Sequence, residues 1–213
     1  MIYHYESNFS NHVHQLVISI SNHLYLLKNE EINYQKKSFN INFKNHSKSK
    51  KRHLVNCIIK DHFSGASYGE IYSTDQLFSI EKFLFNAWKI KEVYKFQGLP
   101  EFLMVPKSVI EHFPGIANIF KHTNVRLIET TSGFHSGAPI IIKEWEKQVC
   151  YAPMLYKLLS FSKLQENIEY FNNKINSFKS DNSDLSKIDK WSNNINRTNI
   201  ITNETDFFKI FNY

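Results

Sequence analysis

The chain has 213 residues, of which 42% are hydrophobic and 15% aromatic. This length suits one substantial domain with an appendage and is crowded for two. No window approaches the roughly 18 consecutive apolar residues of a membrane span, and the start MIYHYESNFSN lacks the pattern of a signal peptide. Cys57 and Cys150 lie in apolar surroundings and form no disulfide framework. We therefore expect a cytoplasmic protein with no membrane partner.

The net charge of +6 is concentrated near the amino terminus. Up to His53 there are 8 Lys and Arg against 3 acids, whereas the remaining 160 residues hold 18 bases and 17 acids. Five of the cations fall within nine residues, at Lys44, Lys48, Lys50, Lys51 and Arg52. Such a local cluster fits either a contact patch for an anionic partner or a solvated loop.

The amino-terminal segment has apolar residues at helical spacing, which predicts a helix over 10–28 with Asn8 or Ser10 as its cap. These positions are Val13, Leu16, Val17, Ile20, Leu24 and Leu27. The pattern changes at SFNINFK, residues 38–44, where apolar and polar residues alternate as in a half-buried strand. We therefore expect residues 1–37 to form an amino-terminal helical segment and the first strand to begin at Ser38.

The middle of the chain predicts an α/β core over 38–150. After the first strand, apolar runs and turn residues predict strands over 53–60, 66–72, 101–105 and 125–130 and helices over 75–91, 108–122 and 141–149. The order is three strands, then helix, strand, helix, strand, helix. This order is that of an RNase H-like fold, a five-stranded mixed sheet with flanking helices. We expect the strand order 3-2-1-4-5, with 38–44 central beside 101–105.

Residues 151–213 are predicted to be a carboxy-terminal extension. A long amphipathic helix is expected over 153–178, with a seam spaced 3, 4, 3, 4, 3. Its members are Phe161, Leu164, Ile168, Phe171, Ile175 and Phe178. We expect this seam to be buried, against the core or in self-association or a partner protein. Beyond it a polar, Asn-rich stretch indicates a loop or weak helix, and the closing FFKIFNY could dock back onto the domain.

Three segments resemble the catalytic core of retroviral-type integrases and DDE transposases. LVNCIIKDHFSGASYG is similar to the second strand, turn and third strand of that family. GLPEFLM resembles the entry to the fourth strand, and NVRLIETTSGFHSGAP resembles the fifth strand and the loop before the last catalytic helix. The resemblance covers 39–148, and it implies DNA as the partner.

The chemistry of that family requires three carboxylates that hold two divalent metal ions. The corresponding positions here are occupied by Asn40, by Pro106 followed by Lys107, and by Ile140. Asp61 and Glu144 are the nearest alternative acids, and each also suits a structural or solvent-facing role. The resemblance therefore implies an integrase-like fold whose catalytic acids are missing.

Three functions remain open on these residues. The first is a catalytically inactive, nucleic-acid-binding or accessory protein of a mobile element, without cofactor, that contacts nucleic acid through the basic cluster at 44–52. The second is an active DDE recombinase whose metal site we have misregistered, and it would need Mg²⁺. The third is a protein–protein interaction module on an RNase H scaffold. The absence of all three acids favours the first over the second, and the basic cluster favours the first over the third.

Overall fold

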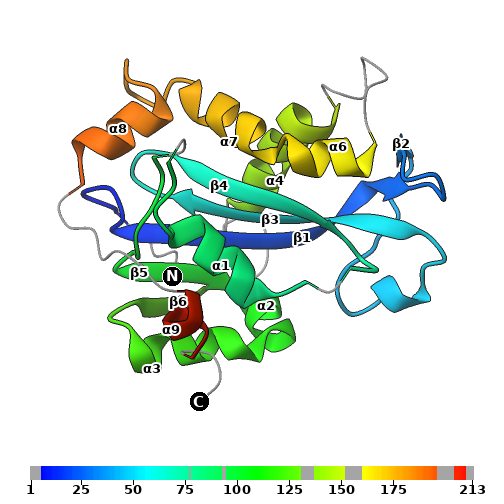
Figure 1. Ribbon diagram of the computed structural model, residues 1–213, viewed down its shortest axis with the longest axis horizontal. Coiled ribbons are helices and arrows are strands. Elements are labelled where there is room, and N and C mark those ends of the chain that lie inside the picture. The colour runs from blue at the N-terminus through cyan, green and yellow to red at the C-terminus, as the bar shows by residue number, and fades with distance from the viewer. Residues whose placement is uncertain are drawn as a thin grey trace.

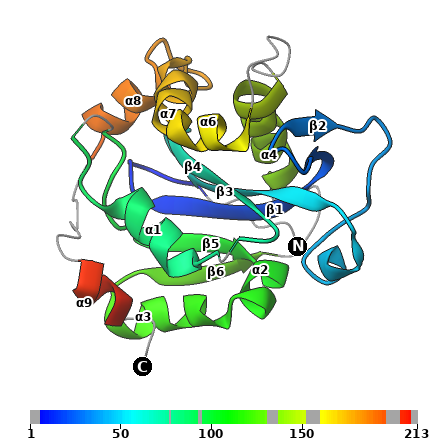
Figure 2. The same ribbon diagram turned by 45° about the vertical axis from the view of Figure 1, so that its right-hand side comes forward.

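The computed structural model describes residues 6–76, 78–92, 95–130, 137–151, 160–195 and 204–209. A twisted mixed sheet forms the centre, with helices on both faces (Figure 1, Figure 2). The strands are β1 (Val13–Leu26), β2 (Ile32–Tyr34), β3 (Arg52–Asp61), β4 (Ser67–Ser73), β5 (Phe102–Pro106) and β6 (Arg126–Thr130). Their order is β4-β3-β1-β5-β6, and β2 pairs with β1. The chain therefore has the predicted RNase H-like mixed α/β fold, with the predicted strand order.

The identity of the central strand differs from the prediction. Residues 13–26 form the 14-residue strand β1, so the predicted helix over 10–28 is wrong. One row of its side chains, which includes Leu16 and Ile18, packs into the core on one face of the sheet, while Val17 and Leu24 pack into the core on the other. Because β1 is buried on both faces, apolar residues occur at both parities and produce helical spacing by coincidence.

Residues 38–44 do not form a strand, so the prediction that they are the first strand is wrong. This segment crosses the edge of β1: the amide of Phe39 donates to the carbonyl of Asn22 at 2.9 Å, and the amide of Ile41 donates to the Asn22 side chain at 3.0 Å. Asn40 has a left-handed backbone with φ of 49°. The apolar alternation arises because Phe39, Ile41 and Phe43 each pack into the core from a loop.

The helices predicted over 75–91 and 108–122 are present but shorter, and the one predicted over 141–149 begins three residues earlier. Six belong to the core region or pack on it: α1 (Ile80–Trp88), α2 (Lys107–His112), α3 (Ile119–His122), α4 (Ala138–Glu146), and the 3-10 turns η1 (His46–Lys48) and η2 (Pro114–Asn118). The predicted helix over 108–122 is interrupted at Pro114, which cannot donate a helical hydrogen bond. A single π-helical turn, η4 (Lys147–Tyr151), follows α4. Such turns are often found at functional sites.

The predicted seam of the carboxy-terminal extension is buried against its own sheet. Two short helices, α6 (Phe161–Glu166) and α7 (Ile168–Ser177), replace the single long helix from residue 160 onward, and 152–159 lie outside the described residues. Phe161, Leu164, Phe171 and Ile175 are all buried in the core that α4 also covers. These four residues of the seam therefore pack within the molecule.

The extension continues into structured segments that its polar sequence concealed. Helices α8 (Lys187–Asn193) and α9 (Glu204–Lys209) both contribute to the core on the α1 side. The buried indole of Trp191 donates to Asn11 Oδ1 at 3.0 Å, and the ring of Phe207 lies 5.7 Å from that of Phe85. The stretch after residue 178, predicted to be a loop or weak helix, therefore contains the helix α8, which Trp191 anchors in the core. None of the described helices is long and apolar enough to cross a membrane.

Candidate functional site

The central strand β1 extends beyond the end of its parallel neighbour β5, and this leaves the carboxyl end of the sheet open. β5 pairs with β1 only over Val13–Gln15, whereas β1 continues to Leu26. On its other side β1 is antiparallel to β3. In open α/β sheets, ligands bind beyond the carboxyl ends of parallel strands, where the topology switches direction. The second half of β1 is therefore where a site is expected.

A cleft of about 660 Å³ lies between this half of β1 and α4. Its lining includes Ser19, Ser21, Lys143, Glu146 and Tyr151. Glu146 is buried at the end of α4, and Tyr151 ends the π-helical turn that follows. The end of α4 and the π-helical turn therefore supply a carboxylate and a phenol to the lining of the cleft.

A buried polar cluster underlies this cleft. Asn56 on β3 is the direct cross-strand neighbour of Ser19 on β1, and its Nδ2 donates to Glu146 Oε1 at 2.8 Å. The Ser19 Oγ and the Asn56 Oδ1 are both buried, and neither has a hydrogen-bond partner among the described residues. Burial, reinforced by the Glu146 carboxylate, raises the pKa of the Tyr151 hydroxyl and that of the Cys150 thiol. Both groups are consequently neutral, and Cys150 is no nucleophile.

A second cleft, of about 440 Å³, opens on the β5 side of the same strand. It shares Ser19, Ile20 and Asn22 with the first cleft, so the two meet along β1. The remaining lining comes from the loop after residue 40 and from α2, including Phe43 and His112.

The positions predicted for the family's acids lie in a loop, at the end of a strand and on a helix. Asn40 is exposed in the loop that crosses β1, and Ile140 is 71% exposed on the first turn of α4. Pro106 ends β5, and Ser108, two residues later, lines the second cleft. Around the clefts the structure brings together Ser19, Asn56 and Glu146, which the sequence reasoning missed. They could have been found only by assigning β1 as a strand and then aligning it with β3 in the correct register.

The two alternative acids have structural partners. Asp61 is buried in the turn after β3, where its carboxylate accepts hydrogen bonds from the Asn11 amide and from the amide and hydroxyl of Ser64, at 2.6–2.8 Å. Glu144 forms an ion pair with Lys187 of α8. Within the part of the chain that the structure describes, no group of three or more His, Cys, Asp or Glu residues is placed to hold a metal ion.

The basic cluster divides into bound and unbound cations. The Arg52 guanidinium pairs with Glu30 and Asp75 and donates to the carbonyl of Leu27, and the Lys51 Nζ lies 3.8 Å from the centre of the Tyr25 ring. Lys44 forms an exposed ion pair with Glu111 at 3.4 Å. Lys48 and Lys50 are exposed, and neither forms an ion pair with any residue in the described ranges.

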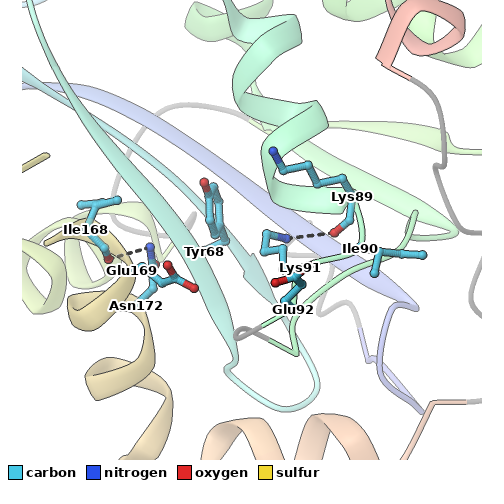
Figure 3. Close-up of a pocket in the computed structure, with 8 residues that line it drawn as sticks. All are labelled: Tyr68, Lys89, Ile90, Lys91, Glu92, Ile168, Glu169 and Asn172. Carbon is cyan, nitrogen blue, oxygen red and sulfur yellow. Dashed lines mark hydrogen bonds between the residues drawn. The ribbon is translucent and has the colours of Figure 1, made fainter. Parts of the chain in front are cut away.

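A third cavity, of about 420 Å³, lies away from these clefts, between Tyr68 of β4, the end of α1 and α7 (Figure 3). Burial, aided by the charge of Lys89, lowers the pKa of Lys91 to about 7. The Lys91 Nζ donates to the carbonyls of Ala87, Lys89 and Phe96 at 2.6–3.2 Å. Because its protons are used to close the end of α1, we assign Lys91 a structural role.

The sheet order and the flanking helices define the fold of an integrase catalytic core, within the RNase H-like class. Among solved structures, the chain resembles one from the simian T-cell lymphotropic virus intasome in complex with the PP2A regulatory subunit B56 gamma. The TM-score is 0.54 at 12% identity, over 94% of this chain and 61% of that one. The chain thus spans about three-fifths of the length of this neighbour.

A second similar structure is the HTLV-2 integrase catalytic core domain in complex with magnesium, at a TM-score of 0.49 and 12% identity, over 87% of this chain and 99% of that one. No family model and no curated protein matches the sequence. At these identities the resemblance establishes the fold alone.

Proposed function

We propose that this protein is an integrase-like nucleic-acid-binding protein that does not carry out two-metal strand transfer, and that it serves as an accessory factor of a mobile element. The observation that carries the proposal is the composition of the clefts at the carboxyl ends of β1 and β5. They occupy the expected ligand site of the fold, yet they present Ser19, Ser108 and Lys143. Hydroxyls and ammonium groups suit phosphate contacts, and an ammonium group repels a divalent metal ion.

Positive charge surrounds these clefts. Lys44 lines the second cleft and Lys143 the first, while Lys107 directly precedes the cleft residue Ser108. Lys48 and Lys50 extend the same basic surface along the loop that carries Lys44. All five side chains are exposed. Several lysines at the mouth of a polar cleft supply the electrostatic part of binding to a phosphate backbone.

The hydrogen bonding of the carboxylate in the first cleft supports the proposed absence of two-metal catalysis. Glu146 lines this cleft, and its carboxylate accepts a hydrogen bond from the Asn56 amide. Two-metal catalysis requires ions about 3.5–4 Å apart held by several anionic ligands, and the two carboxylates that line the clefts, Glu146 and Glu111, are engaged by Asn56 and Lys44.

The interaction-module alternative is weakened by the packing of the extension. The seam of α6 and α7, which could have received a partner, is buried against the protein's own sheet. Along these two helices and the residue that follows them, Tyr170 and Phe178 are the large apolar side chains left exposed. Two separated side chains make a poor interface core.

Fluorescence anisotropy with labelled single-stranded and duplex DNA tests the binding function. We expect the double variant Lys48→Ala/Lys50→Ala to bind both forms more weakly than the wild type. Lys163→Ala/Lys174→Ala is the matched control, because it removes the same charge from α6 and α7, away from the clefts. Equal binding by the wild type and both double variants would show that the basic loop is only a solvated loop.

Strand-transfer assays with Mg²⁺ and Mn²⁺ test the absence of catalysis. We expect no joining of DNA ends by the wild type. Divalent-dependent strand transfer that Asp61→Asn abolishes would restore the recombinase function. Because Asp61 caps a buried turn, that variant needs a parallel thermal melt to separate lost folding from lost chemistry.

A further inference from the structure

We propose that the second cleft is a pocket for one unstacked base of a single-stranded nucleic acid, which stacks on Phe43 and His112 while its phosphate is bound by Lys44. This inference rests on the proposed nucleic-acid-binding function and adds the substrate class and the position of the base. Four features of the cleft carry it: its aromatic side, its rigid loop, its unused polar groups and its cation.

One side of the cleft is aromatic. The rings of Phe43 and His112 have centroids 4.7 Å apart and planes inclined by 31°. Both residues also line a smaller cavity of about 200 Å³, so this ring pair separates the two hollows. The floor is apolar and includes Ile18 and Ile41. Aromatic and apolar side chains that expose a flat surface in a cavity of this size suit a planar ring.

The loop that supplies Phe43 is held in place by its own asparagines. The Asn45 Oδ1 accepts from the Asn42 amide at 2.7 Å, the Asn42 Oδ1 accepts from the Lys44 amide at 2.9 Å, and the Asn45 Nδ2 donates to the Asn40 carbonyl at 3.1 Å. Behind Phe43, the Phe113 ring packs edge-on at 5.6 Å. The pocket is therefore formed before a ligand arrives, which lowers the entropic cost of binding.

The polar groups of the cleft have unused hydrogen-bonding capacity. In Asn22 and Asn42 the side-chain oxygens accept backbone amides, whereas their Nδ2 groups make no hydrogen bond to a described residue. Ser108, which is exposed at the mouth of the cleft, adds a hydroxyl. Amide donors and hydroxyls at the edge of an apolar pocket can pair with the nitrogen and oxygen atoms on the edge of a base.

The cation lies at the rim. Lys44 is paired with Glu111 at 3.4 Å, but their side chains are 79% and 48% exposed. An exposed ion pair of this kind contributes little to stability. A phosphate can therefore replace Glu111 as the partner of Lys44 at small cost.

The concave shape of the cleft favours a single strand. In a duplex each base is stacked on both faces and paired at its edge, so it cannot enter such a pocket unless it is first extruded. A single strand offers its bases without that cost, and stacking on aromatic side chains depends little on sequence.

The experiment compares single-stranded and duplex binding in three variants. Phe43→Leu keeps apolar volume and removes the stacking face. Ser108→Leu blocks the cleft from an exposed position where folding tolerates the change. Phe178→Leu, at the exposed end of α7, is the matched control. The probes are a labelled oligothymidine strand and a labelled hairpin duplex, and thermal melts confirm that each variant is folded.

We expect Phe43→Leu and Ser108→Leu to reduce single-strand affinity by roughly 5- to 150-fold, as the loss of one stacked base requires, while duplex affinity changes by less than about twofold. A strand with one 2-aminopurine should lose fluorescence on binding to the wild type, and Phe43→Leu should restore it. Unchanged single-strand affinity in both variants, or an equal loss for the duplex, would overturn the base pocket and leave the proposed function intact. No binding of either probe by the wild type would instead refute the proposed function.

Discussion

The side-chain amide of Asn172 pairs with the backbone of Gly69 as a neighbouring strand would. Its Oδ1 accepts from the Gly69 amide at 2.8 Å, and its Nδ2 donates to the Gly69 carbonyl at 2.9 Å. One turn later, Asn176 makes the same two contacts with Ser67, at 2.8 and 2.7 Å. Four helical residues rise about 6 Å and two strand residues about 6.7 Å, so the two repeats match. Helix α7 therefore closes the open edge of β4 against pairing with another chain.

Replacing Asn172 by alanine should destabilise the protein by about 1–3 kcal/mol, because the buried amide and carbonyl of Gly69 lose their partners. The measurement is the midpoint of urea unfolding. Asn173→Ala is the matched control: Asn173 is the next residue of α7, and its side chain makes no hydrogen bond to a described residue. Equal loss of stability in both variants would mean that the effect comes from helix propensity and that the edge contact contributes nothing.

A methyl group at Gly69 should be costly for a different reason. A Cβ there would lie 2.4 Å from the nearest atom of the Trp145 ring. We expect Gly69→Ala to cost roughly 1–3 kcal/mol, the usual range for overpacking a core. Trp145→Phe leaves a smaller ring, so the double variant should lose less stability than the sum of the two single variants. Additive losses in thermal or urea melts would refute the steric explanation.

Acid should destabilise the protein through His14. This buried ring accepts from the Trp88 indole at Nδ1, at 3.1 Å, and contacts the Asn11 Oδ1 through Nε2 at 2.9 Å. Burial, together with the charge of Lys91, lowers the pKa of His14 from 6.5 to about 3. The Asp61 carboxylate, 3.8 Å away, favours the protonated form, but a proton on Nδ1 would break the Trp88 contact.

The sign follows from proton binding. Between pH 6.5 and about 3 the unfolded chain binds a proton at His14 that the folded protein does not, so stability falls as the pH drops, by up to about 1.4 kcal/mol per pH unit. Burial raises the pKa of Asp61. At pH values just above the normal pKa of an aspartate, the folded protein therefore binds a proton at Asp61 that the unfolded chain does not, and this partly offsets the loss of stability. NMR titration isolates the histidine: the His14 ring should remain neutral at pH 5, and a ring that titrates near 6.5 would contradict the prediction.

The strand order and most strands could be predicted from the sequence, because β3, β4, β5 and β6 are short apolar runs bounded by turn residues. It failed at β1, since a strand buried on both faces lacks the alternation that distinguishes it from a helix. That single error moved the expected first acid from β1 to Asn40, in a loop. The polar cluster of Ser19, Asn56 and Glu146 is brought together by β1–β3 register and by the π-helical turn after α4, and neither can be read from residue spacing.

The cations of the basic cluster should separate into structural and binding residues. Arg52→Ala should destabilise the protein, because the partly buried guanidinium joins Glu30 and Asp75 and also donates to a backbone carbonyl. Lys50→Ala should leave stability within about 0.5 kcal/mol, as is usual for an exposed surface substitution. Urea unfolding of the two variants tests this, and equal stability would show that the Arg52 contacts carry no net energy.

The salt dependence of nucleic-acid binding should reflect only those cations that are exposed and able to contact phosphate. Lys44, Lys48 and Lys50 remain exposed, whereas Lys51 lies over the Tyr25 ring and Arg52 is held by its carboxylates. With Lys107 and Lys143 at the clefts, which are also exposed, five phosphate contacts predict a slope of log affinity against log salt of about −4.5 on duplex DNA and about −3.5 on a single strand. The double variant Lys48→Ala/Lys50→Ala should reduce the duplex slope to about −2.7, since three contacts are left. A wild-type slope of only about −2.7 would mean that two of these lysines take no part, whereas an unchanged slope in the double variant would place the phosphate contacts elsewhere on the surface.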